Sequence, residues 1–144
     1  MQTSYKLYSD RFAVGQITDE SIRQIDGQLA AENIIQFGQP VRRGTDKENQ
    51  VKVLDGITAG LCIGFAVRNE ERVTGQYEIN SQVDVLRFGR MAVIVKEAVL
   101  VDDDAYVYAD ATIGKTTASG LKIGKFITAA ALGGLAELQL QLLY

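Results

Sequence analysis

Short apolar stretches separated by glycine-centred turns make up most of the chain, and they predict a protein built of β-strands. After residue 27 the apolar positions alternate with polar ones or form short continuous runs, and no helical period intervenes. Strands at this close spacing favour an all-β, jelly-roll-like sandwich or barrel over alternating strand and helix units. Eight strands are predicted, at residues 34–37, 51–54, 61–68, 83–88, 91–95, 105–109, 125–128 and 135–143.

Two of these segments also predict which faces are buried. Residues 91–95 are apolar on both faces, which suits a central strand of a sandwich or closed barrel. The last strand alternates, so one face belongs to the core and the other to water. Its predicted core face carries Ala136, Leu138, Leu140 and Leu142, and its predicted wet face carries Glu137, Gln139 and Gln141.

Local turn signals connect the predicted strands. Asp55-Gly56 lies between two apolar runs and predicts a tight hairpin turn, because both residues tolerate positive φ. Gly89-Arg90 and Gly133-Gly134 are interpreted as further turns, as is Asn80-Ser81. Residues 19–27 begin with acidic side chains, space two isoleucines three apart and end in glycine, which predicts a single helical turn.

The length of 144 residues predicts one domain, here residues 12–144, preceded by an N-terminal arm at residues 1–11. The arm has neither a helical nor a sustained strand period. It carries Tyr5, Leu7 and Tyr8, and large apolar side chains are costly to leave in water. We therefore expect that these three side chains are covered by the same chain or by another one.

The composition excludes several classes of chemistry. The chain has no histidine, no tryptophan and one cysteine, so His-dependent triads and most zinc enzymes are excluded. Cys62 lies in an apolar run and is interpreted as a small buried hydrophobe. No signal peptide and no segment of about 20 apolar residues is visible, which favours synthesis in a reducing cytoplasm and no membrane partner.

The charge pattern argues against a nucleic-acid partner. The formal net charge is -3, whereas nucleic-acid binders usually carry a positive contact face. One basic spot, Arg42-Arg43, is followed by Lys47 and Lys52 but is interrupted by acidic residues. We interpret it as a solvated or partner-facing loop.

Three motifs suggest chemistry, and each has a simpler interpretation. Residues 114–116 read Gly-Lys-Thr, but the glycine that a phosphate-binding loop needs at residue 109 is Ala109, so a polar turn is favoured. The acidic run at residues 102–104 lacks the spacing of a calcium loop and is interpreted as an exposed turn, although a weak ion site there stays open. Glu70-Glu71 and Glu97 could serve as paired carboxylates, but the aromatic platform of a glycosidase is poorly supplied. We predict no cofactor and no catalytic residue.

Six blocks of the chain resemble, in order, the structural cement or head decoration proteins of tailed bacteriophages. The strongest, VDVLRFGRMAVIVKEAV, is similar to the pattern V-x-V-L-x-x-G-x-x-x-V-x-V-x-x-A-V. The closing block is similar to G-x-F-x-T-x-A-x-x-G-G-L-A-x-L-x-L. The resemblance extends over about residues 12–142, and its blocks are residues 12–17, 37–44, 61–68, 83–99, 105–108 and 124–140.

The resemblance implies a non-enzymatic protein that binds the outside of an assembled phage head. It would clamp neighbouring subunits of the major capsid protein as a homo-oligomer, a dimer or trimer at capsid symmetry axes. A multivalent cement needs no active site, because several weak contacts add up to high avidity. The candidate capsid contacts are Tyr5, Leu7 and Tyr8 of the arm, with Arg42 and Arg43 as polar contacts to an acidic capsid surface.

Two other functions stay open at this point. The chain could be a small β-barrel enzyme or ligand binder, which predicts a deep polar cavity with perturbed carboxylates such as Glu97 or Asp104. It could also be a virion module that binds the host surface, which predicts exposed polar loops far from the capsid. The cement interpretation predicts an extended contact surface without such a cavity.

Overall fold

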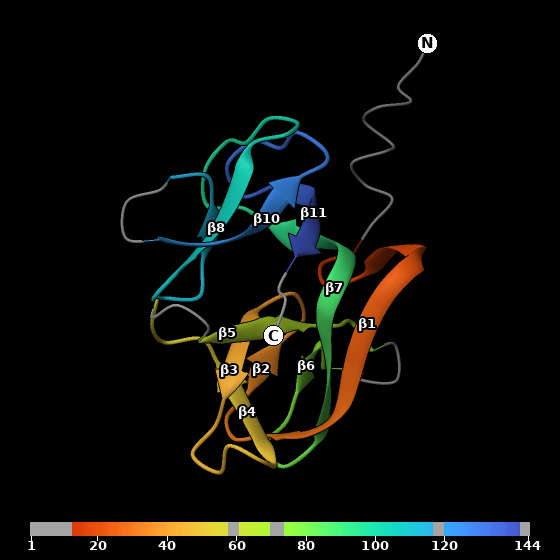
Figure 1. Cartoon of the computed structure of the whole chain (residues 1–144), viewed down its shortest axis with the longest axis vertical. Helices are drawn as coiled ribbons and strands as arrows, with labels where there is room; N and C mark the ends of the chain where they lie inside the picture. Colours follow the sequence, from red (N-terminus) through yellow and green to blue (C-terminus); the bar gives the residue numbers. More distant parts are fainter. Residues whose placement is uncertain (1–12, 58–60, 70–73, 117–119, 142–144) are drawn as a thin grey trace.

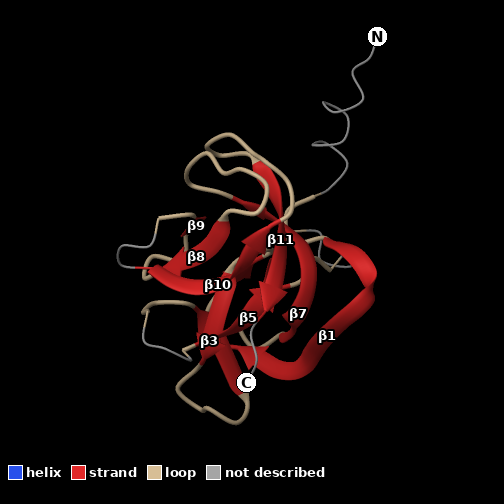
Figure 2. Cartoon of the chain, turned by 45° about the horizontal axis from the view of Figure 1, so that its top comes forward, coloured by secondary structure: helices blue, strands red, loops and turns tan. Residues whose placement is uncertain are grey.

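A computed structural model describes residues 13–57, 61–69, 74–116 and 120–141. Within these ranges the chain forms eleven strands and no helix, so nothing there could span a membrane as a helix (Figure 2). The predicted all-β class is confirmed, as a barrel with additional strands. The strands are β1 (Ile17–Ala31), β2 (Ile35–Gln36), β3 (Pro40–Arg43), β4 (Gln50–Val53), β5 (Cys62–Ala66), β6 (Gln76–Tyr77), β7 (Gln82–Ile94), β8 (Asp104–Tyr108), β9 (Ile113–Gly114), β10 (Gly120–Phe126) and β11 (Leu135–Gln141).

The long strand β7 organises the whole sheet. One of its edges pairs with β1 from Gln82 to Met91, and the other pairs first with β5 and then with β11. Because β1 also pairs with β4, the order β1-β4-β3-β5-β7 returns to β1 and closes a barrel. Figure 1 shows β1 and β7 side by side along the long axis of the molecule.

The remaining strands curl into a second layer beyond β11. The order continues from β7 through β11, β10 and β8 to the short strand β9. The amide of Lys96, just after β7, donates to the Ile113 carbonyl of β9 at 2.9 Å and brings the end of this layer back towards its start. Strands β2 and β6 form a separate two-stranded ribbon.

The buried side chains form two clusters, one on each side of the shared strands. Along β7, Val83 and Val85 belong to the cluster under β1, β3 and β4, whereas Leu86 and Met91 belong to the cluster under β8, β10 and β11. All five residues of β5 are buried, so its two faces serve different clusters. This double burial explains why β5 and residues 91–93 of β7 read as continuous apolar runs.

The predicted turn at Gly89-Arg90 is wrong, because residues 82–94 form one strand. Gly89 lies opposite Leu140 of β11, close to the point where the partner of β7 changes from β5 to β11. It has φ +135°, a conformation that other residues rarely adopt. Gly89 therefore allows the strand to bend at this position.

The predicted helical turn at residues 19–27 is also wrong. This segment lies in β1 and pairs with β7, with Ile25 opposite Leu86. The register shifts between Asp19 and Gln24, so the strand is strongly bulged there. Two isoleucines three apart are a weak helical signal, and the pairing with β7, although interrupted by bulges, overrides it.

The predicted hairpin at Asp55-Gly56 is wrong because β4 and β5 do not pair. Strand β3, which begins at Pro40 and carries two arginines, lies between them. The alternation of apolar and polar residues did not predict β3, because the strand consists of a proline, one valine and two arginines. A proline is nevertheless tolerated at the first position of a strand. Asp55 instead holds Arg42 and Lys52 in ion pairs of 2.6 and 3.2 Å.

Two predicted faces need correction. Ile94 at the end of the apolar run 91–95 is 51% exposed, and Glu137 on the predicted wet face of β11 is only 7% exposed. Glu137 is tolerated in the interior because Thr18 donates a hydrogen bond of 2.8 Å to its carboxylate. The predicted core face of β11 is confirmed for Ala136, Leu138 and Leu140, while Leu142 and the arm at residues 1–11 lie outside the described residues.

The close pairing of β10 with β11 leaves no room for a side chain at Gly124. A Cβ there would lie well inside contact distance of the Gln139 carbonyl on β11. We expect Gly124→Ala to lower the free energy of unfolding by about 1–3 kcal/mol, because the backbone must shift. Urea denaturation measures this change, with exposed Lys125→Ala on the same strand as control. Equal free energies of unfolding for the two variants would contradict this close approach of β10 to β11.

Candidate functional site

The two candidate arginines lie at the end of β3 and are held in place by neighbours. The Arg42 guanidinium donates to Asp55 at 2.6 Å, and the Arg43 guanidinium donates to the Lys47 carbonyl at 2.8 Å. Lys52 lies opposite Arg42 on β4 and shares Asp55. The hydrogen bond from Arg42, helped by Lys52, holds the pKa of Asp55 below its usual value. The structure thus places Arg42 and Lys52 together as a half-exposed basic cluster, whereas Arg43 lies opposite Val51 and its side chain reaches the turn at Lys47.

The turn that follows Arg43 is stiffened by carboxylates. Both the amide and the hydroxyl of Thr45 donate to Glu32 at 2.7 Å, and these bonds lower the pKa of Glu32. Asp46 accepts hydrogen bonds from Glu48 and Asn49 within the same turn. The basic cluster therefore stands beside a preformed turn.

The other candidates from the sequence, Tyr5, Leu7 and Tyr8, lie outside the described residues.

Sequence analysis missed an exposed apolar surface, here called the apolar tip, made of Leu100, Val101 and Leu132. Their side chains are 64%, 57% and 74% exposed. They lie on two loops that are joined by reciprocal backbone hydrogen bonds between Val99 and Ala130, of 2.9 and 3.1 Å. Figure 1 places these loops at one end of the long axis and the β3–β4 turn at the other end.

The signal for the apolar tip was present in the sequence but ambiguous. Residues 98–101 and 129–132 are uncharged runs next to turn residues. A short apolar run without period does not reveal whether it is buried or exposed. Only the tertiary arrangement of the two loops shows that these side chains face water.

Glu97 binds the turn that resembles a phosphate-binding loop. Its carboxylate accepts hydrogen bonds from the amides of Lys115 at 2.9 Å and Thr116 at 3.2 Å, and from the Thr116 hydroxyl at 2.9 Å. Burial opposes ionisation, but these hydrogen bonds outweigh it and lower the pKa of Glu97. The protein's own carboxylate thus occupies the amides that a phosphate would need, and the predicted polar turn is confirmed.

The acidic run and the cysteine have structural roles. Asp103 accepts a hydrogen bond of 2.8 Å from the Leu100 amide, and Asp104 pairs with Lys122 at 3.5 Å. No group of three acidic, cysteine or histidine side chains that could hold a metal ion occurs in the described ranges. Cys62 is fully buried as predicted, and burial raises the pKa of its thiol to about 12.

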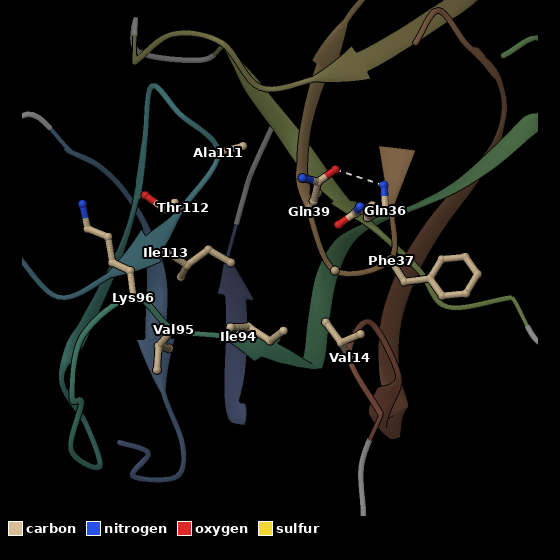
Figure 3. Close-up of a pocket in the computed structure, with 11 residues that line it drawn as sticks. Val14, Gln36, Phe37, Gln39, Ile94, Val95, Lys96, Ala111, Thr112 and Ile113 are labelled. Atoms are coloured by element: carbon tan, nitrogen blue, oxygen red, sulfur yellow. Dashed lines mark hydrogen bonds between the residues drawn. The ribbon is translucent and has the colours of Figure 1, made fainter. Parts of the chain in front are cut away.

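Two of the cavities formed by described residues are well defined, and neither of these is lined by Glu97 or Asp104. One, of about 400 Å³, is open and polar, and Asp26 and Arg87 face it. The other, of about 210 Å³, is here called the β7 groove (Figure 3). It is lined by Val14, Gln36, Phe37, Gly38, Gln39, Ile94, Val95, Lys96, Ala111, Thr112 and Ile113.

Comparisons with known proteins relate the chain to phage heads. The family described as structural cement protein (E217 gp24/Pam3 gp6) matches residues 1–141. A chain in the structure titled "The capsid of Myoviridae Phage XM1" is similar in fold, with a TM-score of 0.72, 16% identity and 89% coverage of both chains. The head fiber gp8.5 N base of bacteriophage phi29 has a TM-score of 0.54 and 13% identity, with coverage of 83% of this chain and 95% of that chain. No curated protein matches the chain in sequence.

A substitution of Glu97 tests whether its carboxylate stabilises the folded protein. Its pKa is lower in the folded state, so its stabilising effect is present above the ordinary value of 4.5 and is lost as the pH falls through the folded value. We expect Glu97→Gln to lower the free energy of unfolding at neutral pH by about 1 kcal/mol and to flatten its decline in acid. Thermal unfolding between neutral and acidic pH measures both effects, with exposed Glu48→Gln as control. A Glu97→Gln profile parallel to that of the unchanged protein would argue against this role.

Proposed function

Because the chain belongs to the structural cement protein family and has a capsid-binding structural role, we propose that it clamps neighbouring major capsid subunits from the outside of an assembled phage head. The observation that carries this proposal is the family match, which spans residues 1–141 and so includes the arm as well as the barrel. The protein stabilises the mature shell by adding buried area across the seams between subunits. It acts without catalysis and without a cofactor.

Two separate surfaces support a clamp. The apolar tip and the basic cluster's turn lie towards opposite ends of the long axis (Figure 1). A protein that joins two neighbours needs two contact surfaces, and each of these is rigidly held by hydrogen bonds. Because the loops are ordered before binding, little conformational entropy is lost when they are covered.

The two surfaces differ in the energy that they contribute. Exposed apolar side chains such as Leu132 supply affinity when an interface removes them from water. Arg42 and Arg43 are half-exposed and face an acidic capsid surface, where they guide encounter and orientation more than affinity. The arm reaches the shell with Tyr5, Leu7 and Tyr8, the kind of side chains that anchor interface centres.

Several copies act together on the shell. A homo-oligomer, a dimer or trimer at capsid symmetry axes, multiplies individually weak contacts into high avidity. The protein is made in the host cytoplasm and ends on the exterior of the virion.

The proposal is tested by co-sedimentation with empty shells of the cognate capsid protein, expanded and unexpanded. We expect saturable binding to expanded shells and a higher melting temperature of the decorated shell, because a ligand of the assembled state stabilises that state. Absence of binding to either shell at low and moderate salt would reject the cement function.

Variants of the contact residues separate the surfaces. We expect Tyr5→Ala with Tyr8→Ala to weaken shell binding about tenfold or more at any salt concentration. Arg42→Ala with Arg43→Ala should slow association mainly at low salt, because salt screens charge steering. Kinetic binding to immobilised shells measures both, with the exposed Lys122→Ala variant as control. Unchanged occupancy of the tyrosine variant would reject a role of the arm.

A further inference from the structure

The β7 groove exposes an apolar side chain in the middle of an otherwise buried segment. Ile94 is 51% exposed, whereas its neighbours Val93 and Val95 are fully buried. Figure 3 shows Gln36 and Gln39 on one side of the groove and Thr112 on the other, with Ile94 between them. The groove therefore offers an apolar floor with a rim of amide and hydroxyl groups.

The volume of the groove matches a side chain better than a free ligand. About 210 Å³ is below the ~300–1,000 Å³ typical of small-molecule sites. An apolar floor with a polar rim suits a tyrosine, whose ring is apolar and whose hydroxyl needs a partner.

The N-terminal segment enters the body beside this groove. Val14 lines the groove, and the chain around it is held by hydrogen bonds from the Gly15 amide to the Ala92 carbonyl, 2.8 Å, and from the Gln16 amide to the Ala13 carbonyl, 3.0 Å. The twelve residues before Ala13 therefore start at one wall of the groove.

The far end of strand β11 lies away from the groove. Gln141 lies opposite Phe88, six residues along β7 from Ile94, which corresponds to ~20 Å.

We propose that the β7 groove seats the ring of Tyr8 from the chain's own N-terminal segment. Tyr8 lies six residues before Val14, a reach of at most ~20 Å, and Ser9-Asp10 between them are residues that favour a chain reversal. A segment tethered at the groove has an effective concentration in the millimolar range, so it outcompetes the same segment of a free second copy.

Seating Tyr8 also orients the rest of the arm. In an extended chain alternate side chains point to opposite faces, so Tyr5 and Leu7 face away from the body when Tyr8 faces the groove. In the isolated protein Tyr8 is then a positioning residue that presents the other two side chains, and it contacts the shell only after it leaves the groove. This inference concerns the isolated protein and holds or fails independently of shell binding.

The absence of tryptophan makes the test simple, because Tyr8→Trp introduces a single fluorescent reporter. We expect its emission to lie at shorter wavelength than that of the matched control Tyr5→Trp, and to return to the control value when Ile94→Asp is added. The shift should persist on roughly hundredfold dilution, as an intramolecular contact must. Circular dichroism checks that the exposed Ile94→Asp substitution leaves the fold intact.

A double-mutant cycle tests the tyrosine itself. We expect Tyr8→Ala and Ile94→Ala to change the free energy of unfolding non-additively, and Tyr5→Ala and Ile94→Ala to add. Additivity in both pairs, together with equal emission of the two tryptophan variants, overturns the proposal. A shift that disappears on dilution assigns the groove to a second copy, and a shift at Phe12→Trp but not at Tyr8→Trp assigns it to Phe12; either result also overturns it.

Discussion

Backbone hydrogen bonding along both edges of β7 is the constraint on which the rest of the structure depends. β1 follows one edge, while β5 and β11 share the other, so the strand belongs to both layers. Where this strand is covered on both faces, at residues 91–93, it is apolar, whereas Asp84, Arg87 and Arg90 lie at half-buried positions. It must also bend where its partner changes, which is where Gly89 lies. Strand β7 therefore contributes side chains to both apolar clusters.

The ends of the molecule are shaped by local polar contacts that the strands position. Glu97 binds the turn after β9, Glu32 binds the turn after β3, and the Val99–Ala130 bridge joins the two loops of the apolar tip. Each contact converts a loop into a rigid surface, which lowers the entropy lost on binding. For a protein of the cement family, which has a capsid-binding structural role, such ordered surfaces are the features available for contact.

Much of the strand pattern was readable from local sequence, and the failures have physical causes. The core face of β11 and the burial of Cys62 follow from alternation and apolarity alone. The hairpin at Asp55 and the helical turn near Ile25 failed because their local signals are weaker than a ladder to a distant strand. The arginines of β3 were found as a basic spot, but the partner Asp55 was not, because its pairing depends on strand order.

By itself, the sequence determined the all-β class, the location of most strands, the absence of histidine chemistry and the resemblance to a cement family. These properties depend on residue type and short-range period, which act over a few neighbouring residues. Only the tertiary structure decided that β7 is shared, that Leu132 and Ile94 are exposed, and that Glu97 binds the Gly-Lys-Thr turn. Such properties depend on which distant segments pack together. The same apolar or acidic residue is buried if another segment covers it and exposed if none does.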